Sequence, residues 1–451
     1  MFYFLAFADG DWHRDGWREK INANRWEVIG LGAVTAGAAV IRFYRLGGIP
    51  RVINGDEGVL GLMALETIRL PLANPFALFE NFGALYLQAI YYVMWLLGET
   101  PFALRLLPAI GGTLAIPALY LLARKLFGTQ TAFIVAILLA VSHAHIHFSR
   151  TVAVGYIQGT WLIPLELYFF VSGVENRSLR QLALGGLILG FHFSVYLSAQ
   201  IITAFFIAYT LIALVMCRPL IQNAWRKTFA FWVGVLLVAL PNFTYAALKP
   251  DEFLSRLNKE GTFQSGWLML KMAESGKSAI QILIERVVHA FLSLIHYSAL
   301  EFYGTSSPMV DAITGALFLF GVVYAFWRVR DHRYLLLNGY FWTTAVAVGV
   351  FSIPPEADSY RMLIAIPAVM LLAAIGFQQL LLASTALAKN PLALRVGMSA
   401  LLLIPIGVLN LRIYFMDFAA RCRYGNDERT RFVSRRVSGY AGARDAHFSS
   451  A

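Results

Sequence analysis

The stretch LGGIPRVINGDEGVLG, residues 46–61, marks the end of the first long apolar run and the start of a polar loop. Two adjacent carboxylates, Asp56 and Glu57, stand there between Gly55 and Gly58. Glycine lets a backbone turn sharply and lets another molecule come close. We therefore predict a flexible turn that holds an acidic pair at the mouth of the first hydrophobic segment.

The composition around this stretch is that of a polytopic membrane protein. The 451 residues are 58% hydrophobic and only 14% charged, whereas soluble domains carry about 25% charged residues. Apolar runs of about 17–25 residues, long enough to cross a bilayer, recur along the chain. The net charge of +11 fits cytoplasmic loops and lipid headgroups, and we see no nucleic-acid-binding motif. The two distant cysteines, Cys217 and Cys422, predict no disulfide framework.

The pattern of apolar runs predicts an all-α bundle of about 11–13 transmembrane helices. A short lead-in, residues 1–26, precedes a membrane domain over 27–418, and a short basic tail covers 419–451. Loops rich in arginine and lysine are assigned to the cytoplasm. This assignment places a first loop, 47–82, and a second loop, 249–278, outside, and the first loop contains the amphipathic helical pattern GVLGLMALETIRL.

Two segments of the predicted bundle leave the count of spans open. Segment 279–300 carries four titratable residues and is predicted to be interfacial or re-entrant. Segment 83–98 is short and is the candidate for a second segment that does not cross. The predicted spans are 27–46, 83–98, 103–123, 130–148, 152–172, 181–197, 200–217, 229–247, 311–327, 334–353, 361–383 and 396–415.

The acidic pair is the first candidate site. A carboxylate at a membrane surface can accept a proton from an attacking hydroxyl group or bind a divalent cation. Asp56 and Glu57 are therefore candidates for a catalytic base or for metal ligands. The alternative is a solvated turn that carries two charges.

The stretch SHAHIHFSR, residues 142–150, ends another span with three alternating histidines, His143, His145 and His147. A strand would place all three on one face, whereas a helix would place only His143 and His147 together. The pattern allows a metal site, and the competing interpretation is polar side chains at a helix end in the membrane interface. Arg150 is a candidate ligand for a phosphate headgroup, because a guanidinium pairs well with that anion.

Three further features carry polar residues. In IPPEADSYRMLIAIPA, residues 353–368, Arg361 is predicted to meet an anion on the outer side or to extend to the interface. Glu166 lies near the middle of a span and is either functional or satisfied by a neighbouring helix. Residues 248–263, LKPDEFLSRLNKEGTF, predict a capped amphipathic surface helix.

Taken in order, these motifs resemble those of the GT-C glycosyltransferases. RFYRLGGIPRVINGDEG has an R-x-x-R-L-x-x-x-P run followed by an acidic pair, and the likeness continues through ETPFALRLLPAIGGTLAIPALYLLARKLFG, HIHFSR, KPDEFLSR and PPEADSYRMLIAIPAVMLLAAIG to NLRIYF. It is closest to the bacterial and archaeal relatives of dolichyl-phosphate-mannose protein mannosyltransferases and to the lipid A aminoarabinose transferases. The resemblance covers roughly residues 27–418.

The resemblance implies a helical membrane enzyme that passes a sugar from a polyprenyl-phosphate carrier to an acceptor, with inversion at the anomeric carbon. Asp56 would be the general base and Glu57 would support it. Some relatives use a divalent metal ion, for which Asp56 and Glu57 would be the ligands here.

We assign the phosphate of the donor to Arg150 and Arg361, with Tyr360 and His147 beside them. A phosphate leaving group carries negative charge that arginine stabilises. The sequence departs from its relatives at Gln200, where many have an arginine, and after Arg150, where some have a carboxylate.

We therefore predict a glycosyltransferase of the cell (inner) membrane with its active site on the extracytoplasmic side. Its partners would be the lipid-linked donor, the bilayer and an acceptor that is a protein, a glycolipid or a cell-wall polymer. The alternative is a transporter or flippase of a lipid-linked saccharide, which predicts coupled charges near the bilayer centre and inverted repeats. A third interpretation, a non-catalytic scaffold subunit, would tolerate the loss of Asp56.

Overall fold

The computed structural model describes residues 24–53, 55–69, 84–152, 155–217, 225–254, 258, 261–300, 302–352, 359–385 and 391–420. The predicted lead-in up to residue 23, the tail from residue 421 with Cys422, and the loop 353–358 lie outside these residues. Part of the first loop, 70–83, also lies outside them.

The described residues are almost entirely helical, with one isolated bridge between Gly261 and Ser352. The helices in chain order are α3 (Arg25–Phe43), α4 (Gly55–Arg69), α5 (Ala84–Leu97), α6 (Pro101–Phe127), α7 (Thr129–Val141), α8 (His143–Phe148), α9 (Tyr156–Glu175), α10 (Leu179–Phe193), α11 (Ser198–Met216), α13 (Trp225–Leu248), α14 (Pro250–Phe253), α16 (Trp267–Ser275), α17 (Ala279–Ile295), α18 (Ala312–Trp327), α19 (His332–Phe351), the 3₁₀ helix η1 (Ser359–Ala365), α20 (Ile366–Thr385), α21 (Pro391–Leu411) and the π-helix η2 (Arg412–Phe418).

This architecture confirms the predicted all-α membrane fold. Seven helices within the described residues are long and apolar enough to cross a bilayer, and α5, α7, α10 and α18 are shorter apolar helices. The predicted total of about 11–13 spans includes such short helices, so that total stays a prediction. Glycines allow the helices to pack closely: a Cβ on Gly186 of α10 would lie 1.9 Å from the carbonyl oxygen of Phe231 in α13.

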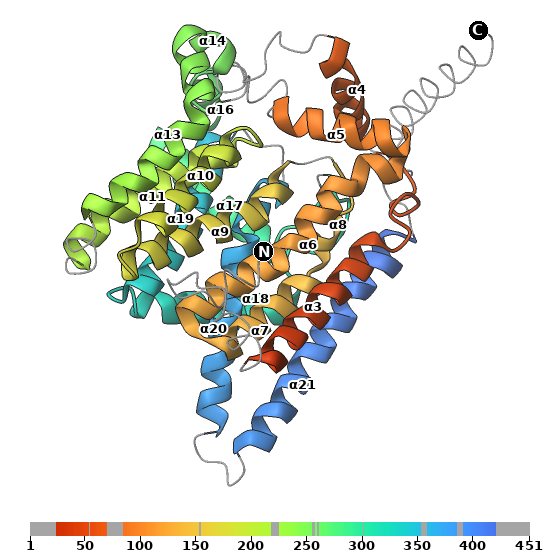
Figure 1. The fold of residues 1–451 in the computed structure, drawn as a ribbon, viewed down its shortest axis with the longest axis vertical. Coiled ribbons are helices and arrows are strands. Elements are labelled where there is room, and N and C mark those ends of the chain that lie inside the picture. The colour runs from red at the N-terminus through yellow and green to blue at the C-terminus, as the bar shows by residue number, and fades with distance from the viewer. Residues whose placement is uncertain are drawn as a thin grey trace.

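One end of the bundle carries the segments that the sequence assigns to the two outer loops. Helices α4 and α5 lie across this end, which is at the top of Figure 1, and α14 and α16 lie at the same end. Helix α5 is one of the shorter apolar helices, and whether segment 83–98 crosses the bilayer stays a prediction. Helices α16 and α17 are bent by 104° at the break between them, the geometry of a broken span or a re-entrant loop. The candidate active site is therefore expected at this end of the bundle.

Candidate active site

The acidic pair lies in the first turn of a helix, not on a flexible turn as the flanking glycines predicted. Helix α4 begins at Gly55, and a helix N-terminus favours negative charge in its first turn. Consecutive residues point about 100° apart around a helix. Glu57 accordingly faces the bundle and is buried, whereas Asp56 is exposed.

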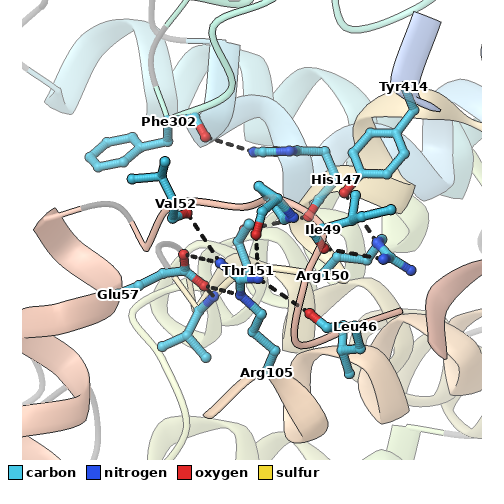
Figure 2. A network of polar contacts seen from close by, with 12 residues as sticks. Leu46, Ile49, Val52, Glu57, Arg105, His147, Arg150, Thr151, Phe302 and Tyr414 are labelled. Carbon is cyan, nitrogen blue, oxygen red and sulfur yellow. Dashed lines mark hydrogen bonds and ion pairs between the residues drawn. The ribbon is translucent and has the colours of Figure 1, made fainter. Parts of the chain in front are cut away.

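A buried ion pair holds Glu57. The Nε of Arg105 in α6 donates to one carboxylate oxygen of Glu57 at 2.9 Å, and Nη2 donates to the other at 3.0 Å (Figure 2). The backbone N–H of Val152 adds a third hydrogen bond, at 3.1 Å. Bidentate pairing of this kind fixes both position and orientation. Glu57 is therefore a positioning residue.

Arg105 also binds the chain that leads into α4. Its Nη1 donates to the carbonyl oxygens of Leu46 (3.2 Å) and Pro50 (2.8 Å), and its Nη2 donates to that of Val52 (3.2 Å). All five N–H groups of the guanidinium are thereby used. Arg105 ties residues 46–52 and α4 to the same point on α6.

A second buried arginine binds the same segment from the other side (Figure 2). Arg150 donates to four carbonyl oxygens and to the hydroxyl of Tyr414, at distances of 2.6–3.1 Å. The four carbonyls belong to Ile41, Arg42, Tyr44 and Ile49. Those of Ile41 and Arg42 are in the last turn of α3, where a helix leaves its own carbonyls unpaired. Glu57, Arg105, Arg150 and residues 41–52 together form what we call the clasp.

The clasp changes the predicted role of Arg150. The guanidinium is fully buried and has no N–H left for a phosphate. In this arrangement Arg150 positions the first loop, and we do not propose it as a ligand of the donor.

A small apolar cluster holds the rest of α4 against the bundle. Leu60 and Ala64 of α4 pack with Leu87 and Ile90 of α5 and with Leu104 of α6. The clasp fixes the first turn of α4 and the cluster fixes the following turns, so the helix is held at two points. The exposed Asp56 is thus presented from a rigid helix.

The three histidines lie in helix α8 and are buried with separate partners. His145 accepts from Arg42 at 2.8 Å and contacts Thr160, while His143 contacts Tyr303 at 3.0 Å. His147 contacts the carbonyl oxygen of Phe302 at 2.6 Å. This agrees with the interpretation as polar residues at a helix end, and His147 is enclosed rather than presented to a phosphate.

The described residues do not fit a metal centre. Among them, no three His, Cys, Asp or Glu side chains come together in a group that could hold a metal ion. Both oxygens of Glu57 are already engaged by Arg105, so the acidic pair does not offer two open carboxylates.

Tyr360 and Arg361 lie in η1 and are partly exposed. The guanidinium of Arg361 lies over the Tyr360 ring, 5.0 Å from its centroid. The Tyr360 ring meets the edge of Phe302, with centroids 4.7 Å apart. Because the carbonyl of Phe302 contacts His147, this pair is linked to the segment that supplies Arg150 to the clasp.

One oxygen of the buried carboxylate Glu166 is hydrogen-bonded within the bundle. It contacts Nδ1 of His192 at 2.9 Å, and Nε2 of the same ring contacts Ser198 at 2.7 Å. These residues come from α9, α10 and α11 and are fully buried. A residue of a neighbouring helix therefore binds one oxygen of Glu166, whereas no described residue hydrogen-bonds its Oε2, so the functional and the structural interpretations of Glu166 both stay predictions.

An apolar groove opens beside the site. Its volume is about 430 Å³, and α5, α6, α9 and α10 supply its walls. Its polar lining includes Tyr86 and Gln158, whose side chains are hydrogen-bonded at 3.3 Å. The other walls include Leu107, Ile110 and Trp161. A groove of this kind suits a hydrocarbon chain.

The sequence interpretation missed Arg105. It lies in the quoted run ETPFALRLLP, where a single arginine stands among apolar residues. A charge inside an apolar helix is costly and normally has a partner. That signal could have connected Arg105 with the acidic pair.

The described residues form a multi-pass membrane protein, and its fold is similar to that of solved GT-C membrane enzymes. A family model described as dolichyl-phosphate-mannose-protein mannosyltransferase matches residues 82–245. No curated protein sequence matches the chain significantly. The predicted resemblance is confirmed at the level of the fold by solved structures.

Two solved structures illustrate this likeness. The archaeal oligosaccharyltransferase AglB from Archaeoglobus fulgidus, in complex with an inhibitory peptide and a dolichol-phosphate, is similar with a TM-score of 0.56 and 15% identity over 88% of this chain. ArnT from Cupriavidus metallidurans, bound to undecaprenyl phosphate, is similar with a TM-score of 0.53 and 14% identity over 93% of this chain. The match spans 56% of the AglB chain and 78% of the ArnT chain.

Proposed function

We propose that this protein is an inverting glycosyltransferase of the cell membrane, which uses a polyprenyl-phosphate-linked sugar and acts at the extracytoplasmic face. The observation that carries the proposal is the division of the acidic pair. Glu57 is locked in the clasp, and the adjacent Asp56 is exposed at the start of the same helix. A rigidly mounted, exposed carboxylate meets the geometric demand on a general base.

The proposed reaction has one displacement step. Asp56 takes the proton of the acceptor hydroxyl while the hydroxyl oxygen bonds to the anomeric carbon. The bond from that carbon to the phosphate oxygen breaks, and its electron pair leaves with the polyprenyl phosphate. Attack opposite to the leaving group inverts the anomeric centre.

The donor would use two further parts of this end of the molecule. The apolar groove of about 430 Å³ accommodates part of an isoprenoid chain. The partly exposed Arg361, held against Tyr360, would neutralise the charge of the phosphate as the bond breaks. The polyprenyl phosphates bound in the AglB and ArnT structures support this class of donor.

The test uses purified protein in lipid with a panel of polyprenyl-phosphate sugars and an envelope fraction that supplies protein, glycolipid and cell-wall acceptors. Release of the carrier phosphate is measured for the wild type and for Asp56→Asn. Losing a general base typically costs about 10²–10⁴-fold in rate, so we expect turnover to fall by that amount.

The matched control is Glu66→Gln, which removes an exposed carboxylate from the same helix. It should leave turnover unchanged. If a folded wild type turns over no donor, the transporter or scaffold interpretations take precedence. If Asp56→Asn keeps full activity, the assignment of the base is wrong even though the enzyme class stands.

A further inference from the structure

The bent helix pair α16–α17 encloses a cavity that the proposed reaction does not use. Helix α16 ends at Gly276, which has a φ of +66°, and α17 begins after Ser278 with a reciprocal Ser278–Gln281 cap. The pair and residues 276–278 between its helices are called the elbow. Its cavity has a volume of about 230 Å³.

Three of the eight described residues that line the cavity are cations. Lys271, Lys277 and Arg286 line it, and Glu285 is the carboxylate among the described lining residues. These four side chains sum to a charge of +2, and Glu274, which pairs with Lys271 at 3.1 Å, lowers the local charge to +1. Lys277 binds both oxygens of Glu285, at 2.6 and 2.8 Å, across the elbow. A cavity with an excess of cations, whose lysines also have the carboxylates of Glu274 and Glu285 as partners, is suited to an anion with several oxygen atoms.

Arg286 makes the cavity more than a group of surface lysines. Only 8% of the residue is exposed, and its Nη2 donates to the carbonyl oxygen of Ser352 at 3.0 Å. The same Ser352 forms the bridge with Gly261, which lies within the segment 249–278 that was predicted as the second outer loop. The cationic wall is therefore anchored to the bundle.

A stripe of exposed apolar side chains begins beside the cavity. Ile280, Ile284 and Val288 follow one another at intervals of four residues along α17, and all three are exposed. Such spacing places them on one face of a helix. Met269 and Leu270 of α16 are also exposed, so both arms of the elbow present apolar side chains outward. An acyl chain lying along this stripe would bring its headgroup to the cations.

We propose that the elbow binds the phosphate group of an anionic membrane lipid, at a site separate from the reacting centre at Asp56. The cations receive the phosphate, and the stripe on α17 receives the acyl chains. Electrostatic attraction combined with apolar burial is the usual basis of such binding. The site lies at the same end of the molecule as α4 (Figure 1). The proposal does not depend on the glycosyltransferase assignment.

The test measures binding to the purified full chain in a neutral detergent. Dioctanoyl phosphatidylglycerol is titrated against the wild type and the Lys271→Gln/Lys277→Gln double variant, with dioctanoyl phosphatidylcholine as the zwitterionic control. We expect the wild type to prefer phosphatidylglycerol, and the double variant to bind it at least tenfold more weakly. The matched control, Lys249→Gln, removes an exposed lysine at the same end and should bind like the wild type.

Glu285→Gln separates ligand binding from a loss of folding. It removes the carboxylate that competes for Lys277, so phosphatidylglycerol should bind several-fold more tightly, a gain that damage to the fold would not produce. Equal binding of both lipids by the wild type would overturn the proposal. Unchanged affinity for phosphatidylglycerol in the Lys271→Gln/Lys277→Gln double variant, or in Glu285→Gln, would overturn it as well. In a final titration, inorganic phosphate competes with phosphatidylglycerol for the wild-type protein. If it competes as strongly as the lipid, the site binds free phosphate and the lipid part of the proposal is wrong.

Discussion

The clasp and the elbow both contain carboxylate–cation pairs at the same end of the molecule, but the two regions differ in burial. The side chains of Arg105 and Glu57 are 0% and 1% exposed, whereas those of Lys277 and Glu285 are 46% and 57% exposed. In the clasp, Arg105 and Arg150 use every guanidinium donor on protein groups. The elbow keeps its pair in contact with solvent, where a ligand can replace one partner.

This difference indicates which pairs maintain the fold and which are available for binding. Breaking a buried pair leaves a charge with neither water nor partner, which costs about 3–5 kcal/mol. An exposed pair is worth about 0–1 kcal/mol, because water substitutes for the lost partner. Substitutions in the clasp should therefore lower the free energy of unfolding, whereas substitutions in the elbow should change ligand binding and leave the free energy of unfolding almost unchanged.

The largest effect is expected for Glu57→Ala. The change strands the Arg105 guanidinium inside the bundle and should lower the free energy of unfolding by about 3–5 kcal/mol. Denaturant unfolding in detergent, followed by tryptophan fluorescence, measures it. Glu66→Ala on the same helix should stay close to the wild type, and an equally stable Glu57→Ala would show that the clasp does not hold α4.

Arg150→Met should have the next largest effect. The variant removes the donor from four backbone carbonyls near the end of α3, and leaving a buried polar group unpaired costs about 1–3 kcal/mol. A lowered unfolding midpoint with an unchanged KM for the donor would support the positioning role. An unchanged midpoint with a raised KM would instead restore the sequence prediction that Arg150 binds the donor phosphate.

The sequence predicted the membrane fold well because apolar runs and loop charges are local signals. The acidic pair and Arg361 were also noticed locally. The division of labour between Asp56 and Glu57 was not predictable, since it depends on Arg105, which is 48 residues away from Glu57. The positioning role proposed for Arg150 was not predictable for the same reason: its sequence position suggests an interface, and only the fold places the carbonyls of residues 41–49 around it.

The elbow pair should contribute little to stability. Lys277→Ala removes the partner of the exposed Glu285, and the expected loss in unfolding free energy is about 0–1 kcal/mol. The difference from the wild type should shrink further in 1 M salt, where screening is strong. A loss as large as that of Glu57→Ala, insensitive to salt, would mean that the elbow is a structural clasp as well.

The smallest effect is expected at Glu252, which follows α13 on the surface. Hydrogen bonds from Lys249 and Tyr245 hold the pKa of Glu252 below its usual range. With a lowered pKa in the folded state, any contribution to stability is present above the ordinary glutamate pKa, about 4.3, and is lost as the pH falls through the folded value. Because the carboxyl group is exposed, we expect Glu252→Gln and the wild type to unfold at the same temperature at pH 7 and at pH 4. A gap at pH 7 that closes at pH 4 would show that an exposed pair can stabilise this end of the molecule as the clasp does, and burial would then not be the property that separates the two regions.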